Sequence, residues 1–259
     1  MITDMTGRIA VVTGGASGIG RALCQAFAAR GAAGVVVADL DADGARAVAA
    51  GLGHQAVGVG CDVASEPDVQ NLVARAQADF GRIDVFCSNA GIIVPGGPEV
   101  RDDAWQRIWA INVHSHVYVA RAVLPGMLDR GEGHLVITAS AAGLLTQLGS
   151  APYAVTKHAA VALAEWLSIT YGDRGISVSC LCPQAVATNM FVGGTGGAEQ
   201  AAVDGVLPPA QVAECVLDAL ADGRFLILPH PEVATYEQRR AEDRDRWLRG
   251  MRRLQARVS

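Results

Sequence analysis

A tyrosine and a lysine lie four residues apart in the segment Tyr153-Ala-Val-Thr-Lys157, and Ser140 precedes them in the chain. Residues four apart on a helix project from the same face, so these two side chains can reach one small volume. A free phenol ionises near pH ~10 and is a poor base at neutrality, but a nearby ammonium group favours its ionised form. We therefore expect Lys157 to lower the pKa of Tyr153 into the range where general acid-base catalysis is efficient.

Short β-rich segments alternate with longer helical patterns, which indicates a parallel sheet with helices on both faces. Several of the strand segments are nearly continuous apolar runs, as is typical of strands buried on both sides. The predicted strands span 9–13, 35–39, 56–62, 85–89, 135–140, 178–182 and 225–228, and the predicted helices span 18–30, 42–52, 66–80, 102–128, 153–171 and 209–221. The pattern predicts a three-layer, doubly wound α/β fold around a parallel seven-stranded sheet.

Composition and charge restrict the class of protein. The chain has 259 residues, of which 51% are hydrophobic and 18% charged, so we expect one large α/β domain with a substantial core. The net charge of -5 gives no general attraction to nucleic acid or to anionic membranes. No apolar run reaches the ~18 residues of a membrane span, and no basic-then-apolar signal sequence opens the chain, so a cytoplasmic protein is expected.

The cysteine and histidine residues predict neither disulfides nor a metal site. The six cysteines form no C-x-x-C pair, which favours free thiols in a reducing compartment. His114 and His116 lie two apart and would therefore point to different faces of a predicted helix. His134 and His158 are expected at helix edges or on the surface, and His230, between two prolines, is expected to shape a turn.

A glycine-rich loop, Thr13-Gly14-Gly15-Ala16-Ser17-Gly18-Ile19-Gly20, follows the first predicted strand and opens the first predicted helix. Glycines allow a tight turn and a close approach of the backbone to a pyrophosphate, while the helix N-terminus supplies N–H donors. Such a loop alone is a weak signal, but its strand-loop-helix context indicates a dinucleotide site.

Asp39 ends the second predicted strand and lies 19 residues after Gly20. A carboxylate at this position can accept hydrogen bonds from ribose hydroxyls and would repel a 2′-phosphate. Neither Ala38 nor the glycine loop offers a cation for such a phosphate, so NAD is predicted in preference to NADP. The alternative is that Asp39 only caps the following helix, a task that Asp41 and Asp43 could perform equally well.

With these motifs in order along the chain, the sequence resembles the short-chain dehydrogenase/reductase family in its compact single-domain form, over nearly its whole length. The glycine loop resembles the family's T-G-x-x-x-G-x-G motif, and Asn89-Ala90-Gly91 resembles its N-A-G motif. The resemblance implies a single NAD-binding Rossmann domain over 1–259, with a substrate loop at about 189–207 and a C-terminal helical arm at about 232–259. The residues that match the family's catalytic tetrad are Asn112, Ser140, Tyr153 and Lys157.

The resemblance also implies what each tetrad member does. Tyr153 would exchange a proton with the substrate oxygen, and Ser140 would hydrogen-bond that oxygen. Lys157 would bind the nicotinamide ribose, and Asn112 would hold a water that connects Lys157 to solvent. The residues implied to bind NAD are Gly14, Ser17, Gly18, Ile19, Gly20, Asp39, Asp62, Val63, Asn89, Ala90, Gly91, Tyr153, Lys157, Pro183, Val186 and Thr188.

The chain departs from the family pattern after the sixth predicted strand, where the usual Pro-Gly is Pro183-Gln184. The Cβ of Gln184 resists the positive φ that glycine allows. We expect either a different backbone path at this point or a Gln184 amide that points into the substrate pocket.

The walls of the substrate pocket, taken from family position, are largely apolar. No lysine or arginine occurs in 140–152 or in 190–205, so an anionic substrate would have no obvious partner in those segments. A hydrophobic secondary alcohol or its ketone is therefore the predicted substrate. The residues expected in the pocket are Ile92, Ile93, Val94, Ala142, Leu144, Leu145, Leu148, Gln184, Met190 and Phe191.

The arginine-rich segment 237–257 has apolar residues at helical intervals. A basic amphipathic helix could bind a membrane surface or nucleic acid. The acidic residues Glu242, Asp243 and Asp245 dilute its positive charge, so we favour an arm that covers a neighbouring subunit or closes the substrate pocket.

These observations predict an NAD-dependent alcohol dehydrogenase or carbonyl reductase that forms a tetramer or dimer and binds neither nucleic acid nor membrane. One alternative is a 3-oxoacyl-thioester reductase, which would more often use NADPH and so conflicts with Asp39. The other is a catalytically idle nucleotide-sensing scaffold. Loss of a tetrad member would have favoured the scaffold, and none is lost.

Overall fold

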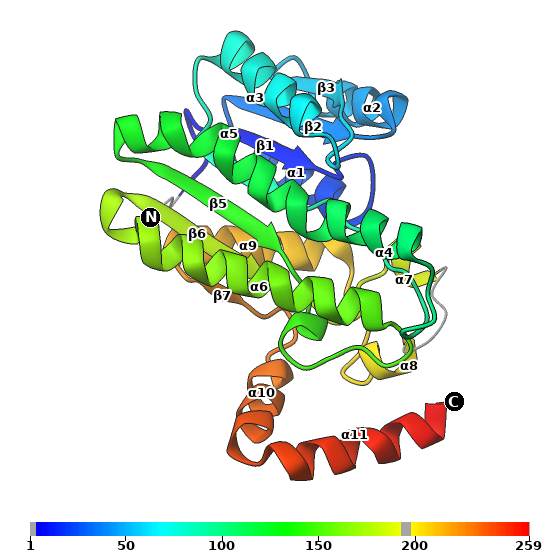
Figure 1. Ribbon diagram of the computed structural model, residues 1–259. Coiled ribbons are helices and arrows are strands. Elements are labelled where there is room, and N and C mark those ends of the chain that lie inside the picture. Colours follow the sequence, from blue (N-terminus) through cyan, green and yellow to red (C-terminus); the bar gives the residue numbers. More distant parts are fainter. Residues whose placement is uncertain (1–3, 193–197, 259) are drawn as a thin grey trace.

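Seven parallel strands form one sheet in the order β3-β2-β1-β4-β5-β6-β7, with helices on both of its faces (Figure 1). The computed structural model describes residues 4–192 and 198–258. The strands are β1 (Ile9–Thr13), β2 (Gly34–Asp39), β3 (Ala56–Gly60), β4 (Val85–Ser88), β5 (Gly133–Thr138), β6 (Ile176–Leu181) and β7 (Leu226–Ile227). The predicted doubly wound parallel sheet of a Rossmann fold is confirmed.

The long helices divide between the two faces of the sheet. They are α1 (Gly18–Ala29), α2 (Ala42–Leu52), α3 (Glu66–Phe80), α5 (Ser115–Arg130), α6 (Ala151–Tyr171) and α9 (Pro209–Asp222). Val11 and Val36 belong to the core that also contains residues of α3, α5 and α6. Val12 and Val37 belong to the core shared with α1, α2 and α9. Because successive strand residues point to opposite faces and both faces are covered, most of the strand residues are apolar.

Local signals set the ends of the helices. The Ser65 Oγ accepts a hydrogen bond from the Asp68 N–H at 3.3 Å and so caps α3, which has a proline in its first turn. The same helix ends at Gly81, whose φ of 80° is left-handed. Helix α5 ends in the same way at Gly131, with a φ of 65°. These caps end the helices, so that the chain turns back toward the sheet after a short loop.

The helix predicted over 102–128 is interrupted. Helix α4 (Asp102–Trp109) runs into a π-helical turn over Ala110–His114, and α5 then continues beyond the predicted end. A π turn inserts one extra residue into the helix and changes the direction of the side chains around it. Asn112 lies inside this turn, which is a feature that the apolar periodicity does not reveal.

Several predicted strand boundaries were wrong by one or two residues. The segments predicted at 56–62, 85–89 and 135–140 end at Gly60, Ser88 and Thr138. In each case the residues just beyond the strand turn toward the edge of the sheet, where they line the cavity described below. The predicted helix starting at 153 begins two residues earlier, at Ala151, with Pro152 in its first turn.

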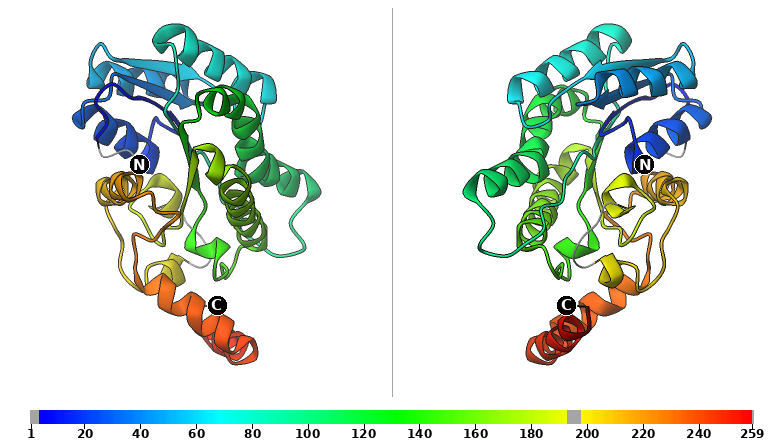
Figure 2. Two further views of the ribbon diagram at one scale, coloured as in Figure 1. Left: turned by 90° about the vertical axis from the view of Figure 1, so that its left-hand side faces the viewer. Right: turned by 90° about the vertical axis from the view of Figure 1, so that its right-hand side faces the viewer.

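The C-terminal arm consists of α10 (Glu232–Glu242) and α11 (Arg244–Val258). In Figures 1 and 2, α11 projects away from the layers of the sheet. Trp247 packs against the core on the α6 side, whereas Leu248 is 46% exposed. The short helices α7 (Asn189–Val192) and α8 (Ala198–Ala201) lie in the predicted substrate loop, whose residues 193–197 are outside the described residues. No helix in the described part of the chain is long and apolar enough to cross a membrane.

His134 is buried rather than at the surface as predicted. Strand β5 begins at Gly133, so His134 lies inside the sheet and is only 2% exposed. Its Nε2 lies 2.9 Å from the Ser179 Oγ, which itself donates a hydrogen bond to the Arg224 carbonyl at 2.7 Å. Burial lowers the pKa of His134 to about 4 because the charged imidazolium is poorly solvated there.

The pKa of His134 predicts a loss of stability in acid. Between pH 6.5 and pH 4 the unfolded chain binds a proton at His134 and the folded chain does not, so the free energy of unfolding falls as the pH falls. We expect His134→Gln, which keeps a hydrogen-bond donor for Ser179, to remove this penalty of up to about 3 kcal/mol. Urea denaturation of both proteins at pH 7 and pH 4.5 should show the variant gaining stability relative to wild type as the pH falls. A pH-independent difference between them would contradict the assignment.

Candidate active site

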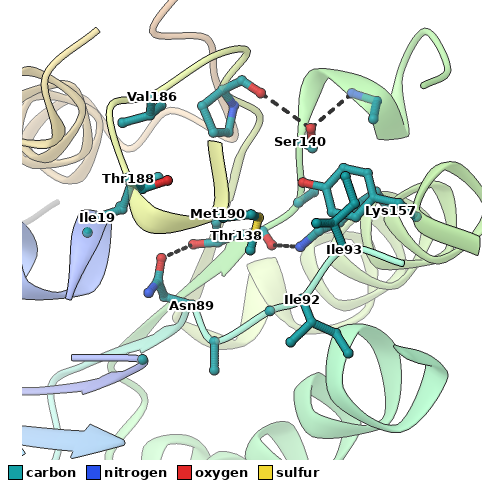
Figure 3. A pocket seen from close by; sticks show the side chains of 18 of the residues that line it. Ile19, Asn89, Ile92, Ile93, Thr138, Ser140, Lys157, Val186, Thr188 and Met190 are labelled. Carbon is teal, nitrogen blue, oxygen red and sulfur yellow. Dashed lines mark hydrogen bonds between the residues drawn. The ribbon is translucent and has the colours of Figure 1, made fainter. Parts of the chain in front are cut away.

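The carboxyl ends of the parallel strands open into one cavity of about 420 Å³. It lies where the strand order reverses between β1 and β4, the position at which open α/β sheets bind ligands. Figure 3 shows side chains from several separate segments that converge on this space. Most of the residues predicted to bind the cofactor line this cavity. Gly20 does not, and its role is steric.

The glycine loop turns tightly at the end of β1. Gly14 has a φ of 67°, which a side chain would disfavour. A Cβ on Gly20 would lie 2.0 Å from the Gly14 carbonyl oxygen, so helix α1 can approach the loop only if position 20 has no side chain. A Cβ on Gly18 would lie 3.0 Å from the Thr188 Cγ2, which places the loop against the segment after β6. The glycines therefore leave backbone exposed to the cavity, beside Ser17 and Ile19, which also line it.

Asp39 lies at the carboxyl end of β2 and lines the cavity. Its two oxygens accept hydrogen bonds from the Ala16 N–H at 3.0 Å and the Asp41 N–H at 3.1 Å. The cap of helix α2 is Asp41, whose carboxylate accepts from the Gly44 N–H at 3.0 Å. Asp39 is therefore not the helix cap, and its carboxylate is fixed between the glycine loop and the cavity.

Asn89 joins the ends of three neighbouring strands. Its backbone N–H donates to the Thr13 Oγ1 at 2.9 Å, and its Nδ2 donates to the Thr13 carbonyl at 3.0 Å. Its Oδ1 accepts from the Thr138 Oγ1 at 3.2 Å. The asparagine thus fixes the end of β1 relative to the ends of β4 and β5.

Asn112 is fully buried and holds the segment that follows β4. Its Oδ1 accepts from the Ile92 N–H and its Nδ2 donates to the Ile92 carbonyl, both at 2.9 Å. The Nδ2 also donates to the Thr156 Oγ1 at 3.2 Å, which connects this segment to α6. The π turn that carries Asn112 gives its amide this orientation.

Lys157 is buried and directed toward the end of β5. Its Nζ donates to the Thr138 carbonyl at 2.8 Å and lies 5.7 Å from the centre of the Tyr153 ring. Burial lowers the pKa of Lys157 to about 8, because a buried ammonium loses hydration. The side chain thus remains largely protonated at neutral pH.

The pKa of Tyr153 differs from the prediction made from spacing. Burial raises it, and this effect exceeds the lowering caused by the hydrogen bond with Ser140. The expectation that Lys157 lowers the tyrosine pKa was therefore wrong for this arrangement, in which the lysine ammonium is hydrogen-bonded to Thr138. Residue spacing does predict that both side chains share one face, but it does not predict how much solvation each loses.

Ser140 lies directly beyond β5 and is buried beside the cavity. Its Oγ accepts a hydrogen bond from the Ala142 N–H at 3.1 Å and lies 3.4 Å from the Pro183 carbonyl, to which it donates (Figure 3). The hydroxyl is therefore held in place on the wall of the cavity. Ser140, Tyr153 and Lys157 all line the same cavity.

Gln184 follows β6 and Pro183 and lines the cavity. It is not among the residues with positive φ, and its N–H donates to the His230 Nδ1 at 3.2 Å. His230 is only 2% exposed, and burial is the largest cause that lowers its pKa. The prediction that His230 only shapes a turn therefore missed its contact with the cavity wall. The Gln184 Oε1 is buried and has no hydrogen-bond partner among the described residues.

Most of the predicted substrate residues lie on the cavity wall. Those that line it are Ile92, Ile93, Ala142, Leu145, Gln184 and Met190. Val94, Leu144 and Leu148 do not line it. The Leu148 N–H is instead hydrogen-bonded to the Gln200 Oε1 at 2.9 Å, which holds that loop against α8. The side chain of Phe191 lies outside the described residues.

Sequence reasoning missed several residues of the cavity. They include Arg107 and Ile111 from α4 and the π turn, Thr146 and Gln147 from the loop after Ser140, and Gln200 from α8. Thr146 has a φ of 146°, which is unusual for a residue with a side chain. Arg107 brings a positive charge to the cavity wall. The expectation that the wall has no lysine or arginine therefore holds only for the segments 140–152 and 190–205.

Comparisons with known proteins agree with this geometry. The sequence profile of the family described as short chain dehydrogenase matches residues 8–195. A 1-deoxy-11-beta-hydroxypentalenate dehydrogenase from Streptomyces exfoliatus is 40% identical over 238 residues, which cover 87% of this chain and 84% of that protein. A 3beta-hydroxysteroid dehydrogenase 2 from Eggerthella lenta is 37% identical over 195 residues, covering 73% of this chain and 75% of that protein.

A solved structure is also similar. A short chain dehydrogenase/reductase from Burkholderia phymatum, crystallised in complex with NAD, superimposes with a TM-score of 0.87 and 30% identity, covering 95% of this chain and 96% of that one. Sequence profile, relatives and structure point to the same group of proteins. The chain belongs to the short chain dehydrogenase family.

Proposed function

We propose that the protein is an NAD-dependent oxidoreductase that interconverts a hydrophobic secondary alcohol and its ketone. The observation that carries the proposal is that Ser140, Tyr153 and Lys157 line one largely apolar cavity together with Asp39. The two relatives described above are named for hydroxyl groups on 11-beta-hydroxypentalenate and on 3beta-hydroxysteroids. An apolar cavity with a few polar groups suits such an alcohol.

The residues that line the cavity at the ends of β1, β2 and β3 fit NAD. The glycine loop at Gly14 and Gly18 leaves room for a pyrophosphate next to the backbone and the start of α1. The Asp39 carboxylate would accept hydrogen bonds from the adenosine ribose, and Asp62 and Val63 line the cavity at the end of β3. Bound NAD would supply the hydride acceptor for the alcohol carbon. The structure of the Burkholderia phymatum protein with NAD supports this choice of cofactor.

In this proposal Tyr153 is the acid and base of the reaction. Its raised pKa favours the phenol, which is the form that donates a proton to the oxygen of a ketone. Alcohol oxidation requires the reverse transfer to a phenolate, so we expect oxidation to become faster as the pH rises. The Ser140 hydroxyl would hydrogen-bond the same substrate oxygen, and protonated Lys157 would bind ribose hydroxyls. Asn112 would orient the surrounding backbone and the water proposed beside Lys157.

A direct assay tests the proposed function. Wild-type protein mixed with NAD and a panel of apolar secondary alcohols should form NADH, measured by absorbance. Tyr153→Phe removes the transferable proton, so we expect turnover to fall by about 10²- to 10⁴-fold while NADH still binds, measured by fluorescence titration. Turnover that survives in the variant would place the proton donor elsewhere. NADH binding without turnover of any alcohol or ketone by wild type would favour the nucleotide-sensing scaffold.

Cofactor preference tests the role of Asp39. Leu40 is 65% exposed, so a larger basic side chain can be accommodated there. Asp39→Ala combined with Leu40→Arg should shift the ratio of kcat/KM from NAD toward NADP by about 10- to 100-fold, because a repulsive carboxylate is replaced by a guanidinium. Leu40→Arg alone is the matched control and should give a smaller shift. Unchanged selectivity in the double variant would contradict the assignment of Asp39.

We also propose that the chain is a homo-oligomer, located in the cytoplasm. Trp166 and Ile169 on α6 are 55% and 83% exposed, and such apolar side chains are common in subunit interfaces. The projecting helix α11 offers a second surface for a neighbouring subunit. Light scattering should therefore give a mass of two or four chains of 26.8 kDa. The mass of a single chain at micromolar concentration would contradict the proposal.

A further inference from the structure

One charged side chain in the cavity has no part in the proposed reaction. Among the described residues that line the cavity, the charged ones are Asp39, Asp62, Arg107 and Lys157. Asp39 and Asp62 lie at the ends of β2 and β3, where the adenosine would bind. Lys157 is hydrogen-bonded to the Thr138 carbonyl at the catalytic end. Arg107 remains, and it enters the cavity from a different element, helix α4.

Arg107 is a cation with no partner. No ion pair or hydrogen bond engages its guanidinium in the described part of the structure. The acidic residue one turn earlier on the same helix, Asp103, is held instead by Arg101, with distances of 2.9 and 3.1 Å between the paired nitrogen and oxygen atoms. Arg107 also lines a second hollow with Val94, Asp103 and Ala104, and its exposed side chain therefore lies at the rim of the main cavity.

The cavity wall that Arg107 shares with the catalytic residues carries several apolar side chains, with Thr146, Gln147, Gln184 and Gln200 as polar members. Ile92, Ile93, Ala142, Leu145 and Met190 line the cavity together with Arg107. A ligand that satisfies all of these groups has an apolar body, a hydroxyl or carbonyl group for Ser140 and Tyr153, and one anionic group for Arg107. A guanidinium fork matches the two oxygens of a carboxylate. A phosphate monoester would bring about two negative charges to a single cation and is less well matched.

We propose that Arg107 binds the carboxylate of the substrate, so that the protein acts on a hydroxy acid with an apolar body or on the corresponding keto acid. This inference rests on the proposed function. In the oxidation, the carbinol carbon transfers a hydride to NAD, and the hydroxyl group transfers its proton to the Tyr153 phenolate. The products are a ketone and NADH, and the carboxylate is unchanged. The Arg107 side chain touches only the carboxylate and therefore determines specificity.

Matched substrates test the inference. The 3- and 4-hydroxycyclohexanecarboxylates carry the proposed anion, and their methyl esters have nearly the same shape without the charge. Wild-type protein with NAD should prefer the acids. Arg107→Leu should lower kcat/KM for the acids by about 10- to 100-fold and leave the esters nearly unchanged, and Arg107→Lys should retain part of the preference. Arg75→Leu, which removes an exposed arginine on α3 outside the cavity, is the charge-matched control and should keep the wild-type preference.

Three results would overturn the inference. The first is an equal effect of Arg107→Leu on acids and esters, and the second is no effect on either. The third is weaker binding of NAD to Arg107→Leu, measured by titration, because Arg107 would then serve the cofactor's pyrophosphate.

A binding measurement separates this inference from the proposed function. Cyclohexanecarboxylate should bind to the NADH-loaded wild-type protein, measured by calorimetry, and Arg107→Leu should weaken this binding by about 10-fold or more. If no hydroxy acid or ester is turned over but this binding depends on Arg107, the carboxylate site stands and the proposed reaction fails. Absent or Arg107-independent binding would refute the carboxylate site even if neutral alcohols are oxidised.

Discussion

Hydrogen bonds of Asn89 connect the side of the cavity formed by the glycine loop to the side that holds Lys157. Asn89 ties the end of β1, where the glycine loop begins, to Thr138 at the end of β5. The Thr138 carbonyl in turn accepts the hydrogen bond from Lys157. A parallel sheet brings the carboxyl ends of its strands to one edge, but it does not fix their relative positions to a fraction of an ångström. The chain of hydrogen bonds from Thr13 to Lys157 links these strand ends, so the proposed cofactor loop and Lys157 are held in one connected network.

Loss of hydration controls the protonation of two side chains in the cavity, Lys157 and Tyr153. Lys157 has its pKa lowered and Tyr153 has its pKa raised, so burial disfavours the ionised form of both. Neutral phenol and a lysine that is still largely protonated at pH 7 are the forms needed to donate a proton and to hold ribose hydroxyls. The unpaired Arg107 at the rim is exposed and keeps its hydration, so a charged substrate group can be recognised there without placing a charge in the apolar interior.

The sequence predicts the fold, the glycine loop and the shared face of Tyr153 and Lys157 because each depends on local patterns: apolar strand runs, glycines after a strand, and a four-residue helical spacing. The other tetrad members, Asn112 and Ser140, are assigned by the family resemblance. It predicts less well what depends on tertiary placement. Arg107 on α4 reaches the cavity through tertiary packing, and His230 reaches the cavity wall through its hydrogen bond with the Gln184 N–H, so neither position follows from its sequence neighbours. The raised pKa of Tyr153 follows from burial, which spacing cannot supply. The π turn around Asn112 leaves no mark in the apolar periodicity.

In the proposed reaction, hydride passes directly between an alcohol carbon and NAD beside Tyr153. Its most direct test is the oxidation of a secondary alcohol deuterated at the carbinol carbon, followed by mass spectrometry of the reduced cofactor. The NADH that forms should carry the deuterium. Ketone formation accompanied by unlabelled NADH, with the deuterium released to water, would contradict it.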